Sequence, residues 1–338
     1  MNKKRILITG GSGFIGSHLV NYILENRTDW DIVLLERLGH SGTFHRLYNF
    51  ESFRVNEIEE TGRVDVVWHD LRSPINDFVK KKIGEVDYIV HMAASTHVDR
   101  SIENPMDFVL DNVVATANLL DFSRTLSDLK MFINFSTDEV FGPAPFGYNH
   151  KESDQHLPSN PYSATKSGAR QLAYSYFVTY KLPTVTTYTL NNFGETQHPE
   201  KFIPRTISSI MNGEEMPMYA TTDENGNVKE ISSRFWVYAK NTADAVCYIL
   251  ENGKVGEDYN IVGFDEYNIL DLANRISDII GKPLKPKFVG FYNARPGHDL
   301  RYALDGTKLK ELGWNPVSNF DEALRQTVEW TIQHPEWM

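Results

Sequence analysis

A run of apolar residues in the stretch FINFSTDEVFG, residues 132–142, ends in three groups that can do acid–base chemistry. Thr137 offers a hydroxyl, and Asp138 and Glu139 are adjacent carboxyls at the end of a segment that is typical of a buried strand. Removing an unpaired carboxylate from water costs several kcal/mol, so the pair needs partners or solvent. Two interpretations follow: the residues cap an acidic turn, or they act as acid and base with pKa values pushed apart by burial and mutual repulsion.

A glycine-rich turn follows the first apolar segment, in the sequence TGGSGFIGSHLV. Gly10, Gly13 and Gly16 form G-x-x-G-x-x-G, and the same stretch also satisfies G-x-G-x-x-G, so the spacing alone does not choose between the two variants. Glycines here let the backbone turn tightly and let a diphosphate approach the amides at a helix N-terminus. The next apolar segment ends in Glu36, twenty residues after Gly16, where an acid would bond the ribose hydroxyls of a dinucleotide. Glu36 disfavours a 2′-phosphate and so favours NAD over NADP, while Arg37 beside it leaves NADP open.

A tyrosine and a lysine lie four residues apart in SNPYSATKSGA. Asn160 can cap a helix with Pro161 at its first position, which places Tyr162 and Lys166 on one helix face. Tyrosine, with a pKa of about 10, is a poor base at neutral pH, but a nearby lysine and the cationic nicotinamide of NAD would stabilise its phenolate. The alternative is a surface helix on which the two residues lie four apart by chance.

The composition is that of an ordinary globular protein that acts on small molecules. The 338 residues are 41% hydrophobic and 23% charged, enough for one large or two medium domains. A formal net charge of −11 argues against nucleic acid or an anionic membrane as the partner. The single cysteine, Cys247, excludes an intramolecular disulfide framework, and the histidines show no metal-ligand spacing, so no metal is expected. No apolar stretch approaches the roughly 20 residues that a membrane-spanning helix needs, and glycines end the N-terminal apolar run before it is long enough for a signal peptide. We therefore expect a soluble, cytoplasmic protein.

Short apolar segments rich in β-branched residues alternate with helical patterns through the first half of the chain. The predicted strands are 5–9, 31–36, 64–70, 86–93, 131–136 and 183–190, with helices such as 16–27, 111–126 and 163–180 between them. This alternation predicts an α/β fold with a doubly wound parallel sheet, the Rossmann architecture, covered by helices on both faces.

From about Asn192 the alternation becomes irregular, with a hairpin turning at DENGN, a further core strand at 259–263, and helices at 269–280 and 320–332. We therefore expect a NAD-binding domain over residues 1–191, with a returning segment near 235–263. A smaller mixed α/β region, which binds the substrate, would occupy 192–338 and be partly interleaved with the first.

Further motifs carry a family resemblance: HMAA at 91–94, STHVDRSI, FSTDEVFG, LNNFG, PEKFIP, DYNIVG and ARPGHDLRYALD. With the glycine turn and Y-x-x-x-K, they resemble the extended short-chain dehydrogenase/reductase family, whose members use NAD and a tyrosine base on nucleotide sugars. The full set, from residue 5 to beyond residue 330, is similar to the dTDP-glucose 4,6-dehydratases. Related epimerases and decarboxylases generally carry small or hydroxyl residues at the positions of Asp138 and Glu139, which makes this carboxyl pair the discriminating feature.

The resemblance implies a lyase reaction with no net redox change. Tyr162, as phenolate, would take the proton of the sugar's 4-hydroxyl while the C4 hydride moves to NAD, and Thr137 would bond the 4-oxygen. The new ketone acidifies the C5 proton, which Glu139 would remove while Asp138, protonated at that stage, protonates the departing 6-hydroxyl. The hydride then returns to C6 and the C5 proton is restored, which gives a 4-keto-6-deoxy sugar. The favoured substrate is dTDP-glucose, and UDP-glucose is the alternative.

The resemblance also assigns contact residues. Besides Glu36 and Arg37, the cofactor contacts would be Gly10, Gly13, Phe14, Ile15, Gly16, Asp70, Leu71, Met92, Ala93, Ala94, Tyr162, Lys166 and Asn192. Besides Thr137, the substrate contacts would be Thr96, Asn191, Lys201, Phe202, Pro217, Tyr219, Arg234, Asn260, Arg295 and His298. Arginines suit a diphosphate, because their planar fork bonds two oxygens at once. Such enzymes commonly dimerise through a four-helix bundle, here the helices after residues 103 and 160, so a homodimer is expected.

Three departures from the family pattern concern the nucleotide pocket. Ser95 and Thr96 stand where these dehydratases usually have Glu before Ser-His-Val-Asp-Arg-Ser, Phe235 replaces Asp in the usual Arg-Asp-Trp, and Glu195 stands where Pro is common. None touches the catalytic set, but they leave the nucleotide open between dTDP, UDP and another base.

Two other classes of function remain as alternatives. A nucleotide-sugar 4-epimerase would use the same NAD and tyrosine, but epimerisation removes no proton from C5, so Asp138 and Glu139 argue against it. A catalytically idle NAD-binding regulator would not need Tyr162 and Lys166.

Overall fold

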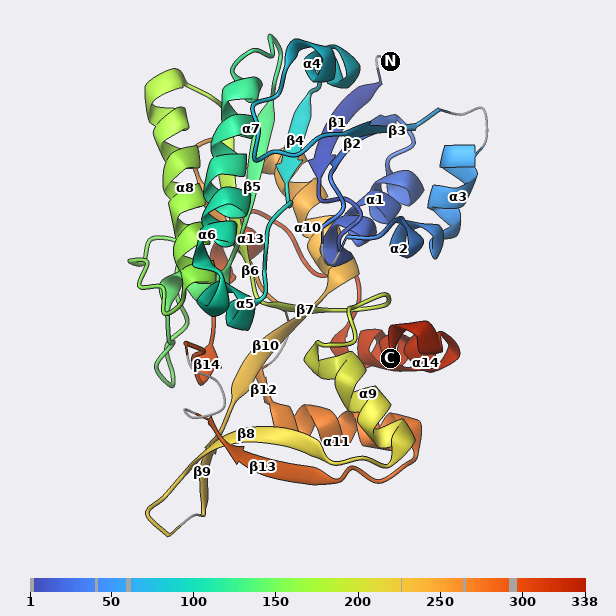
Figure 1. Cartoon of the computed structure of the whole chain (residues 1–338), viewed down its shortest axis with the longest axis vertical. Coiled ribbons are helices and arrows are strands. Elements are labelled where there is room, and N and C mark those ends of the chain that lie inside the picture. Colours follow the sequence, from blue (N-terminus) through green and yellow to red (C-terminus); the bar gives the residue numbers. More distant parts are fainter. Residues whose placement is uncertain (1–2, 40–41, 59–61, 226, 264–265, 292–296) are drawn as a thin grey trace.

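A seven-stranded parallel sheet forms the larger part of the structure, a computed structural model that describes residues 3–39, 42–58, 62–225, 227–263, 266–291 and 297–338 (Figure 1). The strands, in order across the sheet, are β11 (Asp258–Ile261), β6 (Thr184–Thr189), β5 (Met131–Thr137), β4 (Tyr88–His91), β1 (Lys4–Thr9), β2 (Trp30–Glu36) and β3 (Val64–Trp68). The chain builds the sheet outward from β1 to β3, then returns to the other side of β1 and continues through β4, β5 and β6. This reversal confirms the predicted doubly wound α/β fold, whose ligands bind where the carboxyl ends of the strands diverge.

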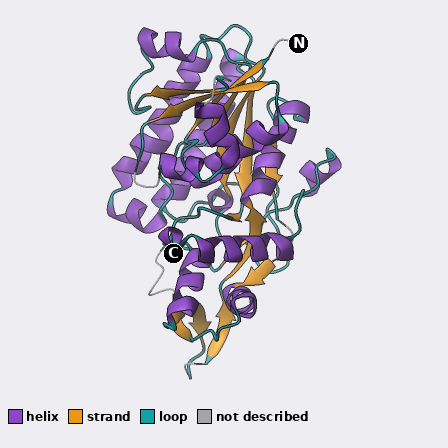
Figure 2. Ribbon diagram, turned by 90° about the vertical axis from the view of Figure 1, so that its right-hand side faces the viewer, coloured by secondary structure: helices purple, strands orange, loops and turns teal. Residues whose placement is uncertain are grey.

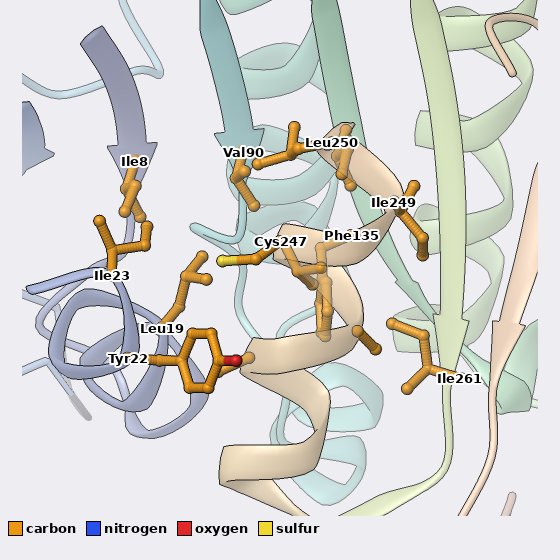
Figure 3. Close-up of a cluster of buried hydrophobic side chains, with 14 of the residues drawn as sticks. Ile8, Leu19, Tyr22, Ile23, Val90, Phe135, Cys247, Ile249, Leu250 and Ile261 are labelled. Carbon is orange, nitrogen blue, oxygen red and sulfur yellow. The ribbon is translucent and has the colours of Figure 1, made fainter. Parts of the chain in front are cut away.

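Alternate side chains of each central strand enter two separate hydrophobic cores, one on each face of the sheet. Ile6 and Ile8 of β1 lie in the first core, and Leu7 between them lies in the second, as the two-residue period of a strand requires. The first core is covered by α1 (Phe14–Asn26), α2 (Phe44–Tyr48), α3 (Glu51–Ile58) and α10 (Ala239–Asn252). The second is covered by α4 (Asp77–Ile83), α7 (Ala115–Ser123) and α8 (Pro161–Tyr180). In the first core, Cys247 lies among apolar side chains of α1, β1 and β4 (Figure 3).

A smaller region with its own two sheets lies beyond the carboxyl ends of these strands (Figure 2). In one sheet, β10 (Ser233–Tyr238) pairs with β7 (Asn191–Phe193), β12 (Glu266–Asn268) and β14 (Arg301–Tyr302). In the other, β8 (Met216–Thr222) lies between β9 (Val228–Ile231) and β13 (Pro286–Gly290). Packed on them are α9 (Phe202–Asn212), α11 (Ile269–Ile280) and α14 (Phe320–Gln333). The antiparallel pair β8 and β9 confirms the predicted hairpin, and α11 and α14 confirm the two predicted helices.

The chain crosses between the two regions more than once. After β10 it forms α10, which packs against α1, and then β11, which pairs with β6 at the edge of the large sheet. The short helix α13 (Thr307–Glu311) packs against β11, and the last turn η3 (Pro335–Trp337) follows α14. The division into 1–191 and 192–338 stays a prediction.

Three short helices, α5 (Val98–Glu103), α6 (Pro105–Phe108) and the π-helix η1 (Val109–Val114), lead from β4 into α7. Together with α8 they run along one side of the large sheet (Figure 1). Among the described residues, no helix has both the length and the apolar character needed to cross a membrane.

Candidate active site

A cavity of about 790 Å³ lies between the carboxyl ends of the parallel strands and the smaller region. Such a volume is in the range of small-molecule sites. Its walls include the turn after β1, the ends of β2, β4, β5 and β6, the start of α8, and residues of β8, β10 and β14. The cavity therefore brings the glycine turn, the carboxyl pair and the tyrosine–lysine pair together, although they are up to about 150 residues apart in the chain.

The glycine turn has the close backbone packing that a dinucleotide cradle needs. Gly10 has φ of +72°, and a Cβ added there would lie 2.8 Å from the amide nitrogen of Ala93. A Cβ added to Gly16 would lie 2.2 Å from the carbonyl oxygen of Gly10, which is a clash. Helix α1 starts after Gly13 without a side-chain cap, so its first amides remain available to an anion.

Glu36, the last residue of β2, lies against this turn. Its carboxylate accepts hydrogen bonds from the amide (3.1 Å) and the hydroxyl (2.7 Å) of Ser12, while burial raises its pKa. The side chain lines the cavity at the end of β2, as the predicted ribose contact requires. The sequence pattern did not identify Ser12 as the partner of Glu36, although the position of Ser12 inside the glycine motif was a signal.

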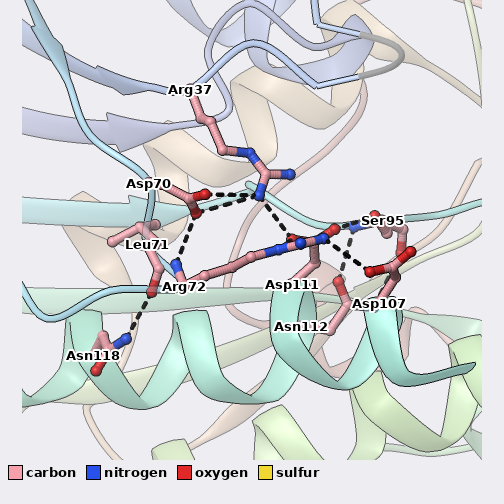
Figure 4. Close-up of polar contacts among 9 residues, drawn as sticks. All are labelled: Arg37, Asp70, Leu71, Arg72, Ser95, Asp107, Asp111, Asn112 and Asn118. Carbon is pink, nitrogen blue, oxygen red and sulfur yellow. Dashed lines mark hydrogen bonds and ion pairs between the residues drawn. The ribbon is translucent and has the colours of Figure 1, made fainter.

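Arg37 lies in a network of carboxylates at the rim of the cavity (Figure 4). Its guanidinium is 3.2 Å from Asp70 and 3.1 Å from Asp111, and Asp111 also accepts from Arg72 at 2.6 Å and from Ser95 at 2.7 Å. Burial opposes ionisation of Asp111, but the bonds from Arg72 and Ser95 hold its pKa below the usual range. Because Arg37 is already paired with two carboxylates, it is a poor partner for a 2′-phosphate.

Asp138 and Glu139 begin the 3₁₀ turn η2 (Asp138–Phe141), directly after β5 ends at Thr137. Burial and then repulsion from Glu139 raise the pKa of Asp138 to about 7. One carboxyl oxygen accepts from the hydroxyl of Thr137 at 2.9 Å, and no described group bonds to the other, Oδ2. Asp138 is one of the residues that line the cavity, and a protonated carboxyl there can donate its proton to a ligand.

Glu139 is partly buried, and the loss of water around its carboxyl raises its pKa, but two donors approach this carboxyl. The side-chain amide of Asn160 donates to its Oε2 at 3.2 Å, and the phenol of Tyr302 lies 3.4 Å from the same oxygen. These bonds favour the ionised form. The two carboxyls thus differ in their surroundings in the way that an acid and a base require.

Helix α8 starts where the sequence predicted. Asn160 accepts from the amide of Ser163 at 2.8 Å, the hydroxyl of Ser163 lies 3.3 Å from the amide of Asn160, and Pro161 occupies the first turn. Tyr162 and Lys166 follow one turn apart, both buried and both lining the cavity.

The surroundings of Tyr162 and Lys166 shift the pKa of both side chains. Burial first and the charge of Glu139 second raise the pKa of Tyr162, while the hydroxyl of Thr137 acts in the opposite direction. Burial lowers the pKa of Lys166 to about 8, and its ammonium donates to the carbonyl of Phe135 at 2.6 Å. The phenol therefore needs further positive charge nearby before it can act as a base at neutral pH.

Most of the remaining predicted contact residues line the same cavity: Phe14, Ile15, Asp70, Leu71, Met92, Ala93, Ala94, Thr96, Asn191, Asn192, Lys201, Phe202, Pro217, Tyr219, Arg234 and His298. Two predicted residues are not among them. Asn260 is fully buried on β11 and donates to the carbonyls of His150 and Asp305, so its amide fixes the fold and does not face the cavity. Arg295 lies outside the described residues.

The chain is similar to known proteins over nearly its whole length. Residues 7–327 match the sequence profile of the GDP-mannose 4,6 dehydratase family. The chain is 37% identical to a dTDP-glucose 4,6-dehydratase of Haemophilus influenzae, with 97% of each chain covered. It is 38% identical, over 99% of its length, to a trifunctional UDP-glucose 4,6-dehydratase/UDP-4-keto-6-deoxy-D-glucose 3,5-epimerase/UDP-4-keto-L-rhamnose-reductase of Arabidopsis thaliana, but it spans only 48% of that protein. The solved structure of DesIV, a dTDP-glucose 4,6-dehydratase of Streptomyces venezuelae with NAD bound, matches with a TM-score of 0.85 at 33% identity over 98% of both chains.

The class that the fold and the cavity define is that of NAD-dependent enzymes built on a Rossmann sheet with a tyrosine–lysine pair. The chain belongs to the extended short-chain dehydrogenase/reductase family and, within it, to the nucleotide-sugar 4,6-dehydratases, which are hydro-lyases.

Proposed function

We propose that the protein dehydrates a nucleoside-diphosphate glucose, with dTDP-glucose as the first candidate, to the 4-keto-6-deoxy sugar. The observation that carries the proposal is the adjacent carboxyls of Asp138, which is buried, and Glu139, which is partly buried, in the same cavity as Tyr162 and Lys166. A 4-epimerase has no use for an acid and a base at C5 and C6, so this pair favours the dehydratase over the epimerase.

The cofactor would be NAD, held by the glycine turn and by Glu36 at the ribose. The close packing at Gly10 and Gly16 and the uncapped start of α1 fit a dinucleotide. When bound, NAD would supply hydride chemistry for the transient oxidation at C4 and the later reduction at C6. The positive charge of its nicotinamide is of the kind that the phenolate of Tyr162 needs and lacks in the protein alone.

The protein's own groups would move three protons. The phenolate of Tyr162 takes the proton of the 4-hydroxyl, and Thr137 bonds the 4-oxygen and orients it. Glu139 then removes the C5 proton, which the C4 ketone has acidified. Asp138 gives its proton to the 6-hydroxyl, which leaves as water. When C6 is reduced, Glu139 returns a proton to C5. With a pKa of about 7, Asp138 is substantially protonated near neutral pH, as a proton donor must be.

The identity of the substrate's nucleotide is a separate part of the proposal. Relatives named for UDP-glucose and for dTDP-glucose are 38% and 37% identical to the chain. Of the positions that depart from the family pattern, Ser95 and Thr96 line the cavity, whereas Glu195 and Phe235 are not among its lining residues. UDP-glucose is therefore the second candidate.

Mass spectrometry of the purified protein incubated with dTDP-glucose and with UDP-glucose, without added cofactor, tests the proposal. Loss of the mass of one water from either sugar nucleotide supports dehydration with retained NAD, and the relative rates assign the nucleotide. Conversion to an isomer of unchanged mass would favour the epimerase instead. No reaction of either substrate, in protein that contains NAD, would contradict the proposed substrates.

We further propose that the protein is a cytoplasmic homodimer whose interface is formed by the helices between Pro105 and Ser123 and by α8. Apolar side chains on this side are exposed, among them Tyr174 and Val178 of α8 and Met106 of α6, and packing against a second copy would cover them. Sedimentation of Val178→Glu should show a monomer where the unchanged protein shows a dimer. A monomer in both would contradict the proposal.

A further inference from the structure

Tyr302 holds a position at the active site that the reaction above does not use. It lies on β14, is almost fully buried, and its phenol lines the cavity beside Glu139. The register of the small sheet places Tyr302 opposite Arg234 of β10, whose guanidinium lies over the tyrosine ring at 4.5 Å. The backbone ladder and the ring contact together fix where the phenol oxygen points.

The hydrogen bonds of this phenol determine where its single hydrogen goes. The oxygen accepts the amide hydrogen of Asp299 at 3.0 Å, which satisfies an acceptor position and leaves the hydroxyl hydrogen for another partner. The acceptor within reach is Oε2 of Glu139, at 3.4 Å. Such catalytic contacts are often long without substrate and tighten in the complex.

The same oxygen of Glu139 also receives the amide of Asn160, at 3.2 Å, and that amide donates in addition to the carbonyl of Gly297 at 3.0 Å. Oε2 thus has two fixed donors, one from the start of α8 and one from β14. No described group donates to the other carboxylate oxygen, Oε1, so Oε1 remains available to take a proton.

We propose that Tyr302 is a positioning residue for Glu139: its phenol donates to Oε2, holds the carboxylate in its ionised form, and leaves Oε1 as the atom that removes the C5 proton. The inference rests on the proposed dehydratase function and adds a residue that neither composition nor spacing signalled. Tyr302 suits this role because burial and the nearby Glu139 keep it protonated, so it remains a donor throughout the working pH range.

The charged and titratable groups that face Glu139 come from several elements: Asp138, Tyr162, Lys201, Arg234 and Asp299. Arg234 and Lys201 favour the ionised carboxylate, and Asp299 opposes it. All of them remain when Tyr302 is changed to phenylalanine, which also keeps the ring under Arg234. Comparing Tyr302→Phe with the unchanged enzyme therefore measures the effect of the hydroxyl alone.

The test is the pH dependence of C5 exchange, measured with the NAD-containing enzyme, the sugar nucleotide that it dehydrates, and deuterated solvent. The rate of C5 exchange should rise with pH as Glu139 ionises, and in Tyr302→Phe this rise should occur about one pH unit higher than in the unchanged enzyme. On the acidic side of the rise, Tyr302→Phe should therefore exchange about tenfold more slowly. At higher pH the exchange rates of the two proteins should converge. Tyr148→Phe is the matched control, because Tyr148 also donates to a carboxylate, Asp154 at 2.8 Å, but lies on the surface outside the cavity.

A profile of Tyr302→Phe that coincides with the unchanged enzyme, or that is lower by one factor at every pH, would overturn the inference, because a merely structural role does not shift the pH at which exchange rises. If Tyr302→Phe does not fold, Tyr302→Met serves as the second variant, since methionine lacks the hydroxyl and adapts to an irregular apolar space. Failure of the proposed function is a separate result, in which the unchanged enzyme removes no water from any nucleotide hexose.

Discussion

Replacing Asp138 with asparagine should stabilise the protein at high pH while removing its activity. Burial first and Glu139 second raise the pKa of this carboxyl from 3.8 to about 7, and its Oδ2 has no partner among the described residues. A raised folded-state pKa means that the contribution of the group to stability is fully present below the unfolded pKa. It is lost as the pH rises through the folded pKa.

The magnitude follows from the size of the shift. One pKa unit is worth about 1.4 kcal/mol, so a shift of about three units costs ~4 kcal/mol once the carboxyl is ionised in both states. The loss runs from about pH 4 to about pH 7. D138N carries no ionisable group at this position, so its free energy of unfolding should gain about 3 kcal/mol relative to the unchanged protein between about pH 5 and about pH 8.

Urea unfolding of both proteins at the two pH values measures this gain, and Asp128→Asn, at an exposed position, is the matched control. The rate of dehydration by D138N should fall roughly 100- to 10,000-fold, the usual contribution of a general acid. If the unfolding free energies of D138N and the unchanged protein differ by the same amount at both pH values, ionisation of Asp138 does not destabilise the folded protein and the reasoning is refuted. An active D138N would refute its role as proton donor.

Three further substitutions test other parts of the site. Glu139→Gln should abolish loss of water but permit oxidation at C4, seen as transient absorbance of reduced cofactor; unchanged loss of water would contradict the role of this base. Lys166→Met removes the ammonium that donates to the carbonyl of Phe135 and should lower the rate roughly 100-fold or more, measured in protein checked for bound NAD; a rate within a few-fold of normal would contradict the predicted role of Lys166 in stabilising the phenolate of Tyr162. Gly16→Ala places a Cβ 2.2 Å from a backbone carbonyl and should lower NAD affinity at least about tenfold in a titration, whereas Gly290→Ala, with open space around it, should not. Equal affinities would mean that the turn adapts.

The local patterns were sufficient to predict the sheet and the start of the site. The alternation of Ile6, Leu7 and Ile8 reports burial on two faces, and Asn160 and Pro161 report a helix start, because these features depend on the nearest few residues. Asn260 shows the limit of such reasoning. It belongs to a recognisable motif, yet its side-chain amide donates to two backbone carbonyls at a position outside the cavity.

What the sequence determined by itself is the set of chemical groups: a glycine turn for a dinucleotide, a tyrosine with a lysine one turn away, and two adjacent carboxyls after a strand. What only the tertiary structure decided is how those groups differ. One oxygen of Asp138 has no hydrogen-bond partner among the described residues, while Glu139 meets Asn160, which caps α8, and Tyr302 of β14, which lie 21 and 163 positions further along the chain. Burial and hydrogen bonding set which carboxyl holds its proton, and both depend on contacts between distant segments, which no local pattern of residue types can specify.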